Sequence, residues 1–369
     1  MQPQPKLNVL DGYGFAWAVT QEQQAERVRC DEAVARREAK WDKYAKRRRF
    51  PELQKLKRYL RKGVPPRLRK WVWFEISGAA RLRDISSSNY YQVLLRTATE
   101  RPSDFKAQIE LDLPRTFPGV QTWLASAEGQ AKLGNVLLAY SMHNPQVGYC
   151  QSMNYVAALL LLSTGKDEED TFWLLMAILE GLLYPGTYSN NLEGCHVEMK
   201  SLAELLAKKE PALAAHMDKL GCDVNLVATD WFLCLFCTTL PIETAARVWD
   251  TLLFEGPKVL YRVALALFKM AAPELLKTDN PGDFLVTMRG IVQTCFDRDT
   301  LMTTAFEKVG SMPMDRISKY RREKQLIVDQ EMARREAIAR TNTMRQTIAE
   351  QSAKYQRSGG HSGGSSSRK

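Results

Sequence analysis

The segment VGYCQSMN, Val147–Asn154, places a phenol, a thiol and an amide just before a strongly apolar run, YVAALLLLS. A cysteine in such a place could act as a nucleophile if a base activates its thiol. His143 is the nearest base along the chain, although a base from elsewhere in the fold would serve as well. We favour the simpler interpretation, in which His143 is a turn residue and Cys150 is a spacer between Tyr149 and Gln151.

A second segment, IELDLPRTFP, places an acidic residue and an arginine around a helix end. Ile109 and Asp112 are three residues apart on a predicted helix, and Pro114 disfavours helical geometry at the residue before it. Arg115 therefore lies at the start of a loop, where we expect Asp112 to hold its guanidinium. Taken alone, this arrangement is also typical of an ordinary surface ion pair.

A third segment, KGVPPRLRKWVWFEISGA, places Arg69 and Trp73 four residues apart, on one face of a helix. Gly63 and the two prolines that follow predict the end of one helix and the start of the next. We interpret Arg69 as structural: it stacks on Trp73 and bonds to a carboxylate elsewhere in the chain.

Several motifs of enzymes and metal proteins are missing from the sequence. It has no GxxxxGK[ST] phosphate loop, no GxGxxG after a strand, no GxSxG and no HExxH. Cys234 and Cys237 form CLFC, but they lie in an apolar stretch without a second ligand pair, and a zinc site needs about four ligands. We therefore expect no metal site, and buried, reduced thiols at these two positions.

The net charge of +10 is unevenly distributed along the 369 residues. Residues 1–62 carry a net charge of +8 and residues 313–369 carry +7, whereas residues 63–312 carry −5. A nucleic-acid-binding domain would show its positive charge on the folded body. The charge pattern therefore argues against nucleic acid as the partner, and it leaves the basic flanks as solvated helices that could also contact an anionic membrane.

Helical periodicity runs through almost the whole chain, and no segment alternates convincingly as a strand. We therefore predict an all-α fold with one large irregular helical domain and charged helical flanks at both termini. The N-terminus lacks the apolar segment of a signal peptide, and apolar runs fall short of the ~18 residues of a membrane span. The expected parts are an irregular N-terminus 1–20, basic helices 21–58, the domain 59–312, a charged helix 313–357 and a flexible Gly/Ser tail 358–369.

Together and in this order, the three segments resemble the fingerprint of the TBC domain, the Rab-type GTPase-activating fold. The family pattern R-x-x-x-W, I-x-x-D-x-x-R and Y-x-Q stands here as Arg69–Trp73, Ile109–Arg115 and Tyr149–Gln151. The later string WFLCLFCTTLPIETAARVWDTLLFEGPKVLYRVALALF is also similar to the family. The resemblance covers roughly residues 60–310 and is strongest to small single-domain members. One departure is Ser152, where the family usually has glycine.

The resemblance implies that the partner is a Rab-family small GTPase in its GTP-bound state. Arg115 would be an arginine finger that stabilises charge on the transferred γ-phosphoryl group, and Gln151 would be a glutamine finger that orients the attacking water. Asp112 would orient Arg115, and Tyr149 would shape the pocket. Ile109 and Asn154 complete the supporting residues. The chain would need no cofactor of its own, because GTP and Mg²⁺ belong to the partner.

Two alternatives remain open at this point. The first is a catalytically weak interaction or adaptor protein on the same scaffold, which the presence of both finger residues disfavours. The second is a membrane or nucleic-acid adaptor that acts through the basic flanks, including the run KRRR at Lys46–Arg49. We expect a cytoplasmic monomer, peripheral on endomembranes, that activates a GTPase and is not itself the enzyme.

Overall fold

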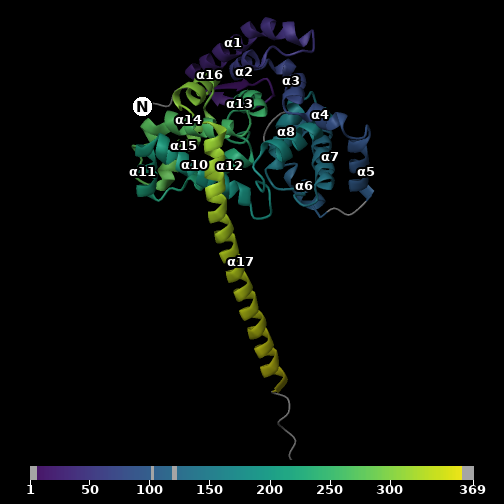
Figure 1. Ribbon diagram of the computed structural model, residues 1–369, viewed down its shortest axis with the longest axis vertical. Coiled ribbons are helices and arrows are strands. Elements are labelled where there is room, and N and C mark those ends of the chain that lie inside the picture. Colours follow the sequence, from purple (N-terminus) through teal and green to yellow (C-terminus); the bar gives the residue numbers. More distant parts are fainter. Residues whose placement is uncertain (1–5, 101–103, 119–122, 360–369) are drawn as a thin grey trace, which may run out of the picture. The chain divides into compact units, whose positions relative to one another are not determined.

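Helices make up most of the computed structural model, which describes residues 6–100, 104–118 and 123–359 (Figure 1). The chain divides into two compact units, Met1–Arg321 and Arg322–Lys369. Apart from one short hairpin, no strand occurs in the described residues. The predicted all-α class is therefore confirmed. Within the same residues, no helix has both the length and the apolarity that a membrane span requires.

A two-stranded antiparallel hairpin lies near the start of the described residues, which corrects the expectation that residues 1–20 are irregular for the part from residue 7 onward. Strand β1 (Leu7–Leu10) pairs with β2 (Ala16–Val19). The Asp11 carboxylate organises the turn, because it accepts hydrogen bonds from the backbone N–H groups of Tyr13 and Phe15 and from the indole of Trp17. Strands of four residues give too short an alternation to be recognised in the sequence.

Two helices follow the hairpin, close to the predicted bounds. Helix α1 (Gln21–Ala45) begins with a capping box in which Thr20 and Gln23 exchange hydrogen bonds between side chains and backbone. Helix α2 (Leu53–Lys62) ends at Gly63, whose φ of 104° lies in a region that side chains rarely adopt. The basic flank therefore folds onto the compact unit and is part of it.

The remaining helices of the first unit form an irregular bundle. A 3₁₀ turn, η1 (Pro66–Leu68), precedes them, and a second, η2 (Trp123–Ala125), precedes α7. Helix α9 continues into the π-helical turn η3 (Ala177–Leu182), and α16 into η4 (Thr304–Lys308). The helices are α3 Arg69–Ile76, α4 Ala79–Asp84, α5 Tyr90–Glu100, α6 Lys106–Asp112, α7 Ala127–His143, α8 Met153–Ser163, α9 Glu168–Met176, α10 Glu193–Lys209, α11 Pro211–Leu220, α12 Val224–Leu233, α13 Ile242–Glu255, α14 Lys258–Leu275, α15 Pro281–Gln293 and α16 Arg298–Thr303.

Helix α8 lies at the centre of the half of the bundle that carries the predicted site. It packs against both α7 and α9, and its residues 156–161 are all fully buried. A helix that is apolar on every side is stable only when it is surrounded by protein. The apolar run in the sequence therefore supplies a rigid support for whatever side chains stand at its N-terminal end.

The Arg69–Trp73 pair has the structural role predicted from the sequence. The carboxylate of Asp250 on α13 accepts hydrogen bonds from the Arg69 guanidinium at 3.0 and 3.2 Å and from the Trp73 indole at 2.9 Å. Its second oxygen also accepts the backbone N–H of Val64 at 2.9 Å. Arg69 lies over the Trp73 ring and also bonds to the Tyr13 hydroxyl. These buried contacts join α3, α13 and the N-terminal hairpin.

Helix α17 (Met314–Gly359) is the predicted charged C-terminal helix. Its first two turns belong to the first unit, in which Ile317 is buried and Arg321 forms a buried ion pair with Glu198. The compact unit therefore extends past the expected boundary at residue 312. The second unit is the rest of this helix, and its side chains are exposed from residue 333 to 351. The predicted Gly/Ser tail lies, from residue 360 onward, outside the described residues.

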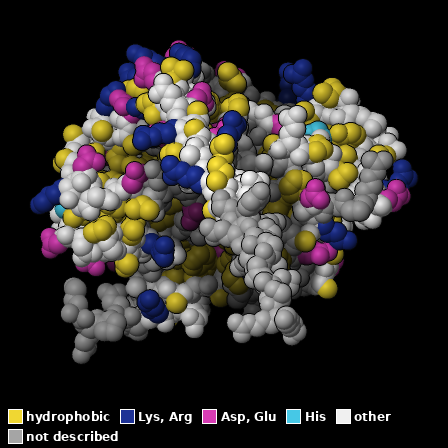
Figure 2. All heavy atoms as spheres, turned by 90° about the horizontal axis from the view of Figure 1, so that it is seen from below, with side chains coloured by type: hydrophobic (Ala, Val, Ile, Leu, Met, Phe, Trp, Pro, Cys, Tyr) yellow, Lys and Arg dark blue, Asp and Glu magenta, His cyan; other side chains and the backbone are white. Residues whose placement is uncertain are grey.

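Charged and apolar side chains are interspersed over the face shown in Figure 2. Lysines and arginines stand there among aspartates and glutamates, with hydrophobic side chains between them. Mixed charge of this kind is typical of an ordinary protein surface.

Candidate functional site

Arg115 projects from a tight turn at the end of α6. The helix ends at Asp112, and the backbone N–H groups of Arg115 and Thr116 donate to the carbonyl oxygens of Asp112 and Leu113. The Arg115 side chain is exposed, and no described residue forms a hydrogen bond or ion pair with its guanidinium. A free guanidinium on a turn of fixed geometry is available to an external anion.

Gln151 projects from a second turn, which leads into α8. Gly148 has a φ of 61°, and a Cβ at this position would lie 1.9 Å from the Phe105 ring, so only glycine fits. Gln151 is exposed, with its amide unpaired among the described residues. Ser152 has a φ of 98°, a strained conformation for any residue with a side chain, which explains why glycine is usual there. Helix α8 begins one residue later, so Gln151 lies just before the helix.

Two buried hydrogen bonds join the turn of Arg115 to the turn of Gln151. The Tyr149 hydroxyl donates to the Asp112 carboxylate at 2.9 Å. The Asn154 side-chain amide donates to the Thr116 hydroxyl at 2.8 Å, while its carbonyl oxygen accepts the backbone N–H of Ser152 at 3.1 Å. Asp112 and Asn154 are each only 1% exposed. We call Tyr149, Asp112, Asn154 and Thr116 the bridge.

A contact between aromatic rings supports the same turn from the other side. The Tyr155 hydroxyl on α8 donates to the carbonyl oxygen of Arg115 at 3.3 Å. The rings of Tyr155 and Phe117 meet edge to face at 5.2 Å, and Phe117 meets Phe15 in the same way at 5.1 Å. Phe15 belongs to the turn of the N-terminal hairpin. The hairpin therefore packs directly on the arginine turn, through a residue that is only two positions from Arg115.

The expectation that Asp112 holds the Arg115 guanidinium is wrong. The Asp112 carboxylate points into the protein, where it accepts hydrogen bonds from Tyr149 and from Gln108, the latter at 3.1 Å. Arg115 lies past the helix end, on a turn that directs its side chain to solvent, so the two side chains diverge. Asp112 positions the arginine through the backbone of the turn. Burial, and next the neighbouring Asp112, raise the pKa of Tyr149, so its hydroxyl stays protonated and donates.

The other two residues predicted to support the site, Ile109 and Asn154, are buried. Ile109 is 1% exposed and packs α6 into the core, and Asn154 belongs to the bridge. Thr116, Phe117, Tyr155 and Asp250 were missed by sequence reasoning. Only Thr116 gave a local signal, since it follows Arg115 directly, whereas the partners of the other three are far away along the chain.

Cys150 and His143 do not form a nucleophile and base. His143 is engaged by the Tyr90 hydroxyl at 2.9 Å on one ring nitrogen and by Glu180 at 3.1 Å on the other. The Cys150 thiol donates to the carbonyl oxygen of Gln151, and burial raises its pKa, which disfavours the reactive thiolate. The geometry therefore supports the interpretation of Cys150 as a spacer.

An open groove of about 750 Å³ lies beside Gln151. Its walls come from the glutamine turn, from the segment around Tyr188–Asn190 and from the end of α12, including Asp230 and Leu233. No cluster of three or more potential metal ligands occurs in the described residues. The site thus consists of an exposed guanidinium and an exposed amide on two joined turns, next to a concave surface.

Comparisons with known proteins identify the family that this chain resembles. The family model of the Rab-GTPase-TBC domain matches residues 66–276. Growth hormone-regulated TBC protein 1-A of Danio rerio is 39% identical over 324 residues, which are 86% of this chain and 90% of the relative. Growth hormone-regulated TBC protein 1 of Homo sapiens is 38% identical over 292 residues, which are 78% of this chain and 85% of the relative.

Solved structures give the same result. The TBC domain of a Chlamydomonas flagellar RabGAP is 43% identical to this chain, with a TM-score of 0.76, and the match covers 81% of this chain and all of that one. The Ypt/Rab-GAP domain of Gyp1p, at 20% identity and a TM-score of 0.65, shares the fold. The resemblance seen in the three sequence segments is thereby confirmed, and the chain belongs to the Rab-GTPase-TBC domain family.

Proposed function

We propose that this chain accelerates GTP hydrolysis by a Rab-family small GTPase, with Arg115 and Gln151 supplied to the partner's nucleotide site. The observation that carries the proposal is the bridge. It fixes the two turns to each other. The Arg115 guanidinium on one turn and the Gln151 amide on the other remain exposed and unpaired among the described residues. Family membership supports the choice of a Rab-family GTPase as the partner.

In this proposal the chain acts on the GTP-bound partner, which carries both GTP and Mg²⁺. Hydrolysis forms a bond from the water oxygen to the γ-phosphorus and breaks the bond from that phosphorus to the β–γ bridging oxygen. Arg115 donates to the phosphate oxygens on which negative charge is spread, and Gln151 accepts a hydrogen bond from the attacking water and holds it in line. The reaction therefore takes place in the partner's active site, to which this chain adds two side chains.

The expected size of the effect follows from the arginine alone. An arginine finger supplied in trans contributes about 10³–10⁵ in rate. At about 1.36 kcal/mol per tenfold, this range corresponds to roughly 4–7 kcal/mol of barrier. Donors that are already in position inside a water-excluded interface can supply a stabilisation of this size.

The groove beside Gln151 is the surface that we propose for selecting the partner. It borders the glutamine turn and reaches across to α12, so a GTPase that delivers its nucleotide to the two fingers would also contact this surface. We further propose that the chain acts as a cytoplasmic monomer and that its basic flanks make peripheral contact with anionic endomembranes. The net charges of those flanks support the membrane contact.

A hydrolysis screen across a panel of GTP-loaded Rab proteins tests the function. We expect at least one Rab to be accelerated, Arg115→Ala to remove about 10³-fold or more of the acceleration, and Gln151→Ala to remove a large part of it. Arg96→Ala is the control, because Arg96 is also an exposed arginine but lies on α5, away from the bridge. The unfolding midpoints of all three variants should match the wild type, since each altered side chain is exposed.

Two outcomes separate this function from its alternative. If no Rab is accelerated, or if Arg115→Ala is as fast as the wild type, the two-finger mechanism is wrong. If GTP-loaded Rab binds without acceleration, the chain is an interaction or adaptor protein on a TBC scaffold.

A further inference from the structure

The groove beside Gln151 carries one charge among the described residues that line it. Of these fifteen residues, Asp230 alone has a charged side chain. This side chain is exposed, and no described residue forms a hydrogen bond or ion pair with it. The groove therefore presents a free carboxylate, on the last turn of α12, to whatever occupies it.

The other titratable groups of the groove stay neutral. Burial raises the pKa of the Cys234 thiol to about 11, and the Asp230 carboxylate adds to this effect. Burial, followed by several neighbouring groups that include Asp230, also raises the pKa of the Tyr155 phenol. The same cause raises the pKa values of Tyr149, Cys150 and Tyr188. All these groups remain protonated near neutral pH, so the negative charge of Asp230 is not accompanied by a second one.

The backbone just after α12 is strained, and this strain fixes the end of the helix. Leu235 and Phe236 have φ values of 49° and 68°, two successive left-handed conformations that residues with side chains rarely adopt. Both side chains are fully buried, and the Trp249 indole donates to the Leu235 carbonyl oxygen at 2.8 Å. Such strain persists only where the surrounding structure holds it. The helix turn that carries Asp230 is therefore firmly placed.

The opposite wall of the groove is also preformed. The hydroxyl of Tyr188 donates to the carbonyl oxygen of Leu233, so this wall is joined directly to the end of α12. A Cβ on Gly194 would lie 2.3 Å from the Pro185 carbonyl oxygen, so only glycine lets the segment before Tyr188 pack so closely on α10. A site that is ordered before binding restricts its occupant more than a mobile one does.

We propose that Asp230 selects the partner: the groove accepts a segment of the GTPase that presents a lysine or arginine next to an apolar side chain. This inference rests on the proposed function and adds the chemistry by which the partner is chosen. The aliphatic stem of such a residue can pack on Tyr155 and Leu233 while its charged end reaches Asp230. A GTPase without this cation would remove water from the carboxylate and leave it unpaired, which weakens binding.

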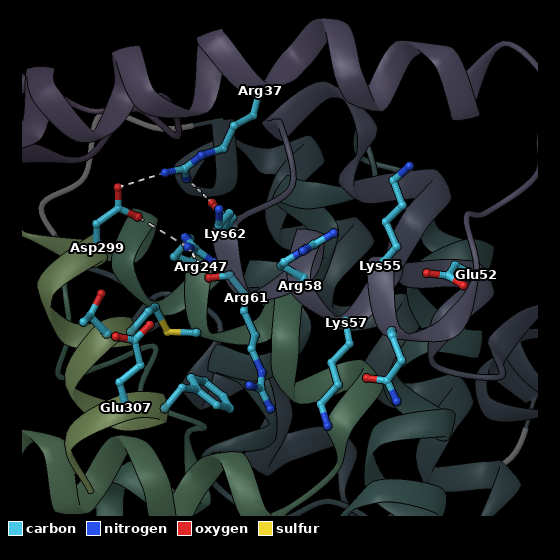
Figure 3. Close-up of a pocket in the computed structure, with 14 residues that line it drawn as sticks. Arg37, Glu52, Lys55, Lys57, Arg58, Arg61, Lys62, Arg247, Asp299 and Glu307 are labelled. Atoms are coloured by element: carbon cyan, nitrogen blue, oxygen red, sulfur yellow. Dashed lines mark hydrogen bonds and ion pairs between the residues drawn. The ribbon is translucent and has the colours of Figure 1, made fainter. Parts of the chain in front are cut away.

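The charges elsewhere on the chain direct the basic segment to this groove. Figure 3 shows a different hollow, lined by Arg37, Arg58, Arg61 and further basic side chains, which would repel such a segment. The Arg115 guanidinium also repels it and attracts the phosphates of the nucleotide instead. A GTPase must therefore bring negative charge to Arg115 and positive charge to Asp230, and two opposite charges at fixed places determine the orientation in which it docks.

The test compares the removal and the reversal of this charge with a control. Asp230→Asn removes the charge, Asp230→Lys reverses it, and the control Asp218→Asn changes an exposed, unpaired aspartate of α11 that does not line the groove. Every Rab of the panel, loaded with a non-hydrolysable GTP analogue, is titrated calorimetrically. For the Rab that binds most tightly, we expect about tenfold weaker binding to Asp230→Asn, about 100-fold weaker binding to Asp230→Lys and a change below about twofold for the control.

Single-turnover hydrolysis separates partner selection from chemistry. The concentration of this chain needed for half-maximal rate should rise in Asp230→Asn by the same factor as the dissociation constant, because Asp230 contacts the GTPase and not the nucleotide. The maximal rate should stay, whereas Arg115→Ala should lower it. Added salt should weaken binding by the wild type more than binding by Asp230→Asn, since salt screens the lost attraction.

The outcomes distinguish this inference from the proposed function. Selection by Asp230 is overturned if both Asp230 variants bind as tightly as the wild type, if Asp218→Asn weakens binding as much, or if the maximal rate falls in place of the affinity. A Rab that is accelerated without any dependence on Asp230 refutes this inference alone. A Rab whose binding depends on Asp230 but which is not accelerated supports the inference and refutes the activation. If no Rab of the panel binds, both are refuted.

Discussion

The hydrogen bond between Tyr149 and Asp112 connects the turn of Gln151 to the turn of Arg115. Its removal tests whether this connection contributes to stability and to the proposed acceleration of GTP hydrolysis. Tyr149→Phe deletes only the hydroxyl that donates to the carboxylate at 2.9 Å. Both residues are buried, at 7% and 1% exposure, so water cannot replace the lost donor freely. The carboxylate keeps one other side-chain donor, the amide of Gln108.

The structure sets the magnitude. A hydrogen bond to a charged group contributes about 1.5–3 kcal/mol to stability, and a buried acceptor that loses its donor sits at the upper end of that range. We therefore expect Tyr149→Phe to lower the free energy of unfolding by about 2–3 kcal/mol. Asp112→Asn keeps an oxygen that accepts from Tyr149 but removes the charge. In that background Tyr149→Phe should cost only about 1 kcal/mol.

The assay is a double-mutant cycle with two readouts. Urea unfolding of the wild type, both single variants and the double variant should give a coupling energy of about 1–2 kcal/mol between the positions. Single-turnover GTP hydrolysis by the partner should slow in Tyr149→Phe, with little change in the concentration of this chain needed for half-maximal rate, because the finger side chains remain but their spacing loosens. If the changes in unfolding free energy of the two single variants add up to that of the double variant within about 0.5 kcal/mol, the coupling is refuted. An unchanged rate despite lost stability would refute the positioning role.

Three further predictions concern residues around the site. Ser152→Gly should raise the free energy of unfolding by about 1 kcal/mol by relieving the strained φ of 98°, and a lower melting temperature would contradict this. Phe15→Ala should slow GTP hydrolysis by the partner, because Phe15 supports Phe117 beside the turn of Arg115. Hydrolysis at the wild-type rate would exclude that support. Arg69→Gln should cost about 3–5 kcal/mol in chemical denaturation, because it leaves the Asp250 carboxylate buried without its cation, whereas an unchanged midpoint with lost activity would point to a catalytic role instead.

Local sequence signals predicted the helical class and the loop start at Arg115 correctly. Pro114 and Gly148 act on the backbone of their immediate neighbours, so their effect on chain direction follows from the residue type alone. The same is true of the fully apolar run in α8, which only a buried helix accommodates. Arg115 was expected at the start of a loop because of Pro114, and the structure has it there.

Contacts between distant segments could not be predicted in the same way. Asp112 was assigned to Arg115 because the two residues are close in sequence, but its actual partner, Tyr149, comes from another helix start. Asp250 likewise joins Arg69 and Trp73 across 177 or more residues. The N-terminal hairpin was missed because its strands pair only with each other and are stable through Asp11 and through packing on the body.

In the proposed mechanism, the bridge would explain how Arg115 and Gln151 can be effective although both are exposed. Fixing the backbone of one residue costs about 1–2 kcal/mol in conformational entropy. If three residues of each turn were ordered only when the GTPase docks, the total cost would be about 6–12 kcal/mol, which is as large as or larger than the roughly 4–7 kcal/mol expected from an arginine finger. The bridge and the Phe117 contact order both turns during folding, so docking has to restrict only the Arg115 and Gln151 side chains, at up to about 2 kcal/mol each. In the proposed mechanism, rapid hydrolysis therefore depends on the buried, uncharged partners Asn154 and Thr116 as well as on the exposed residues that would touch the nucleotide.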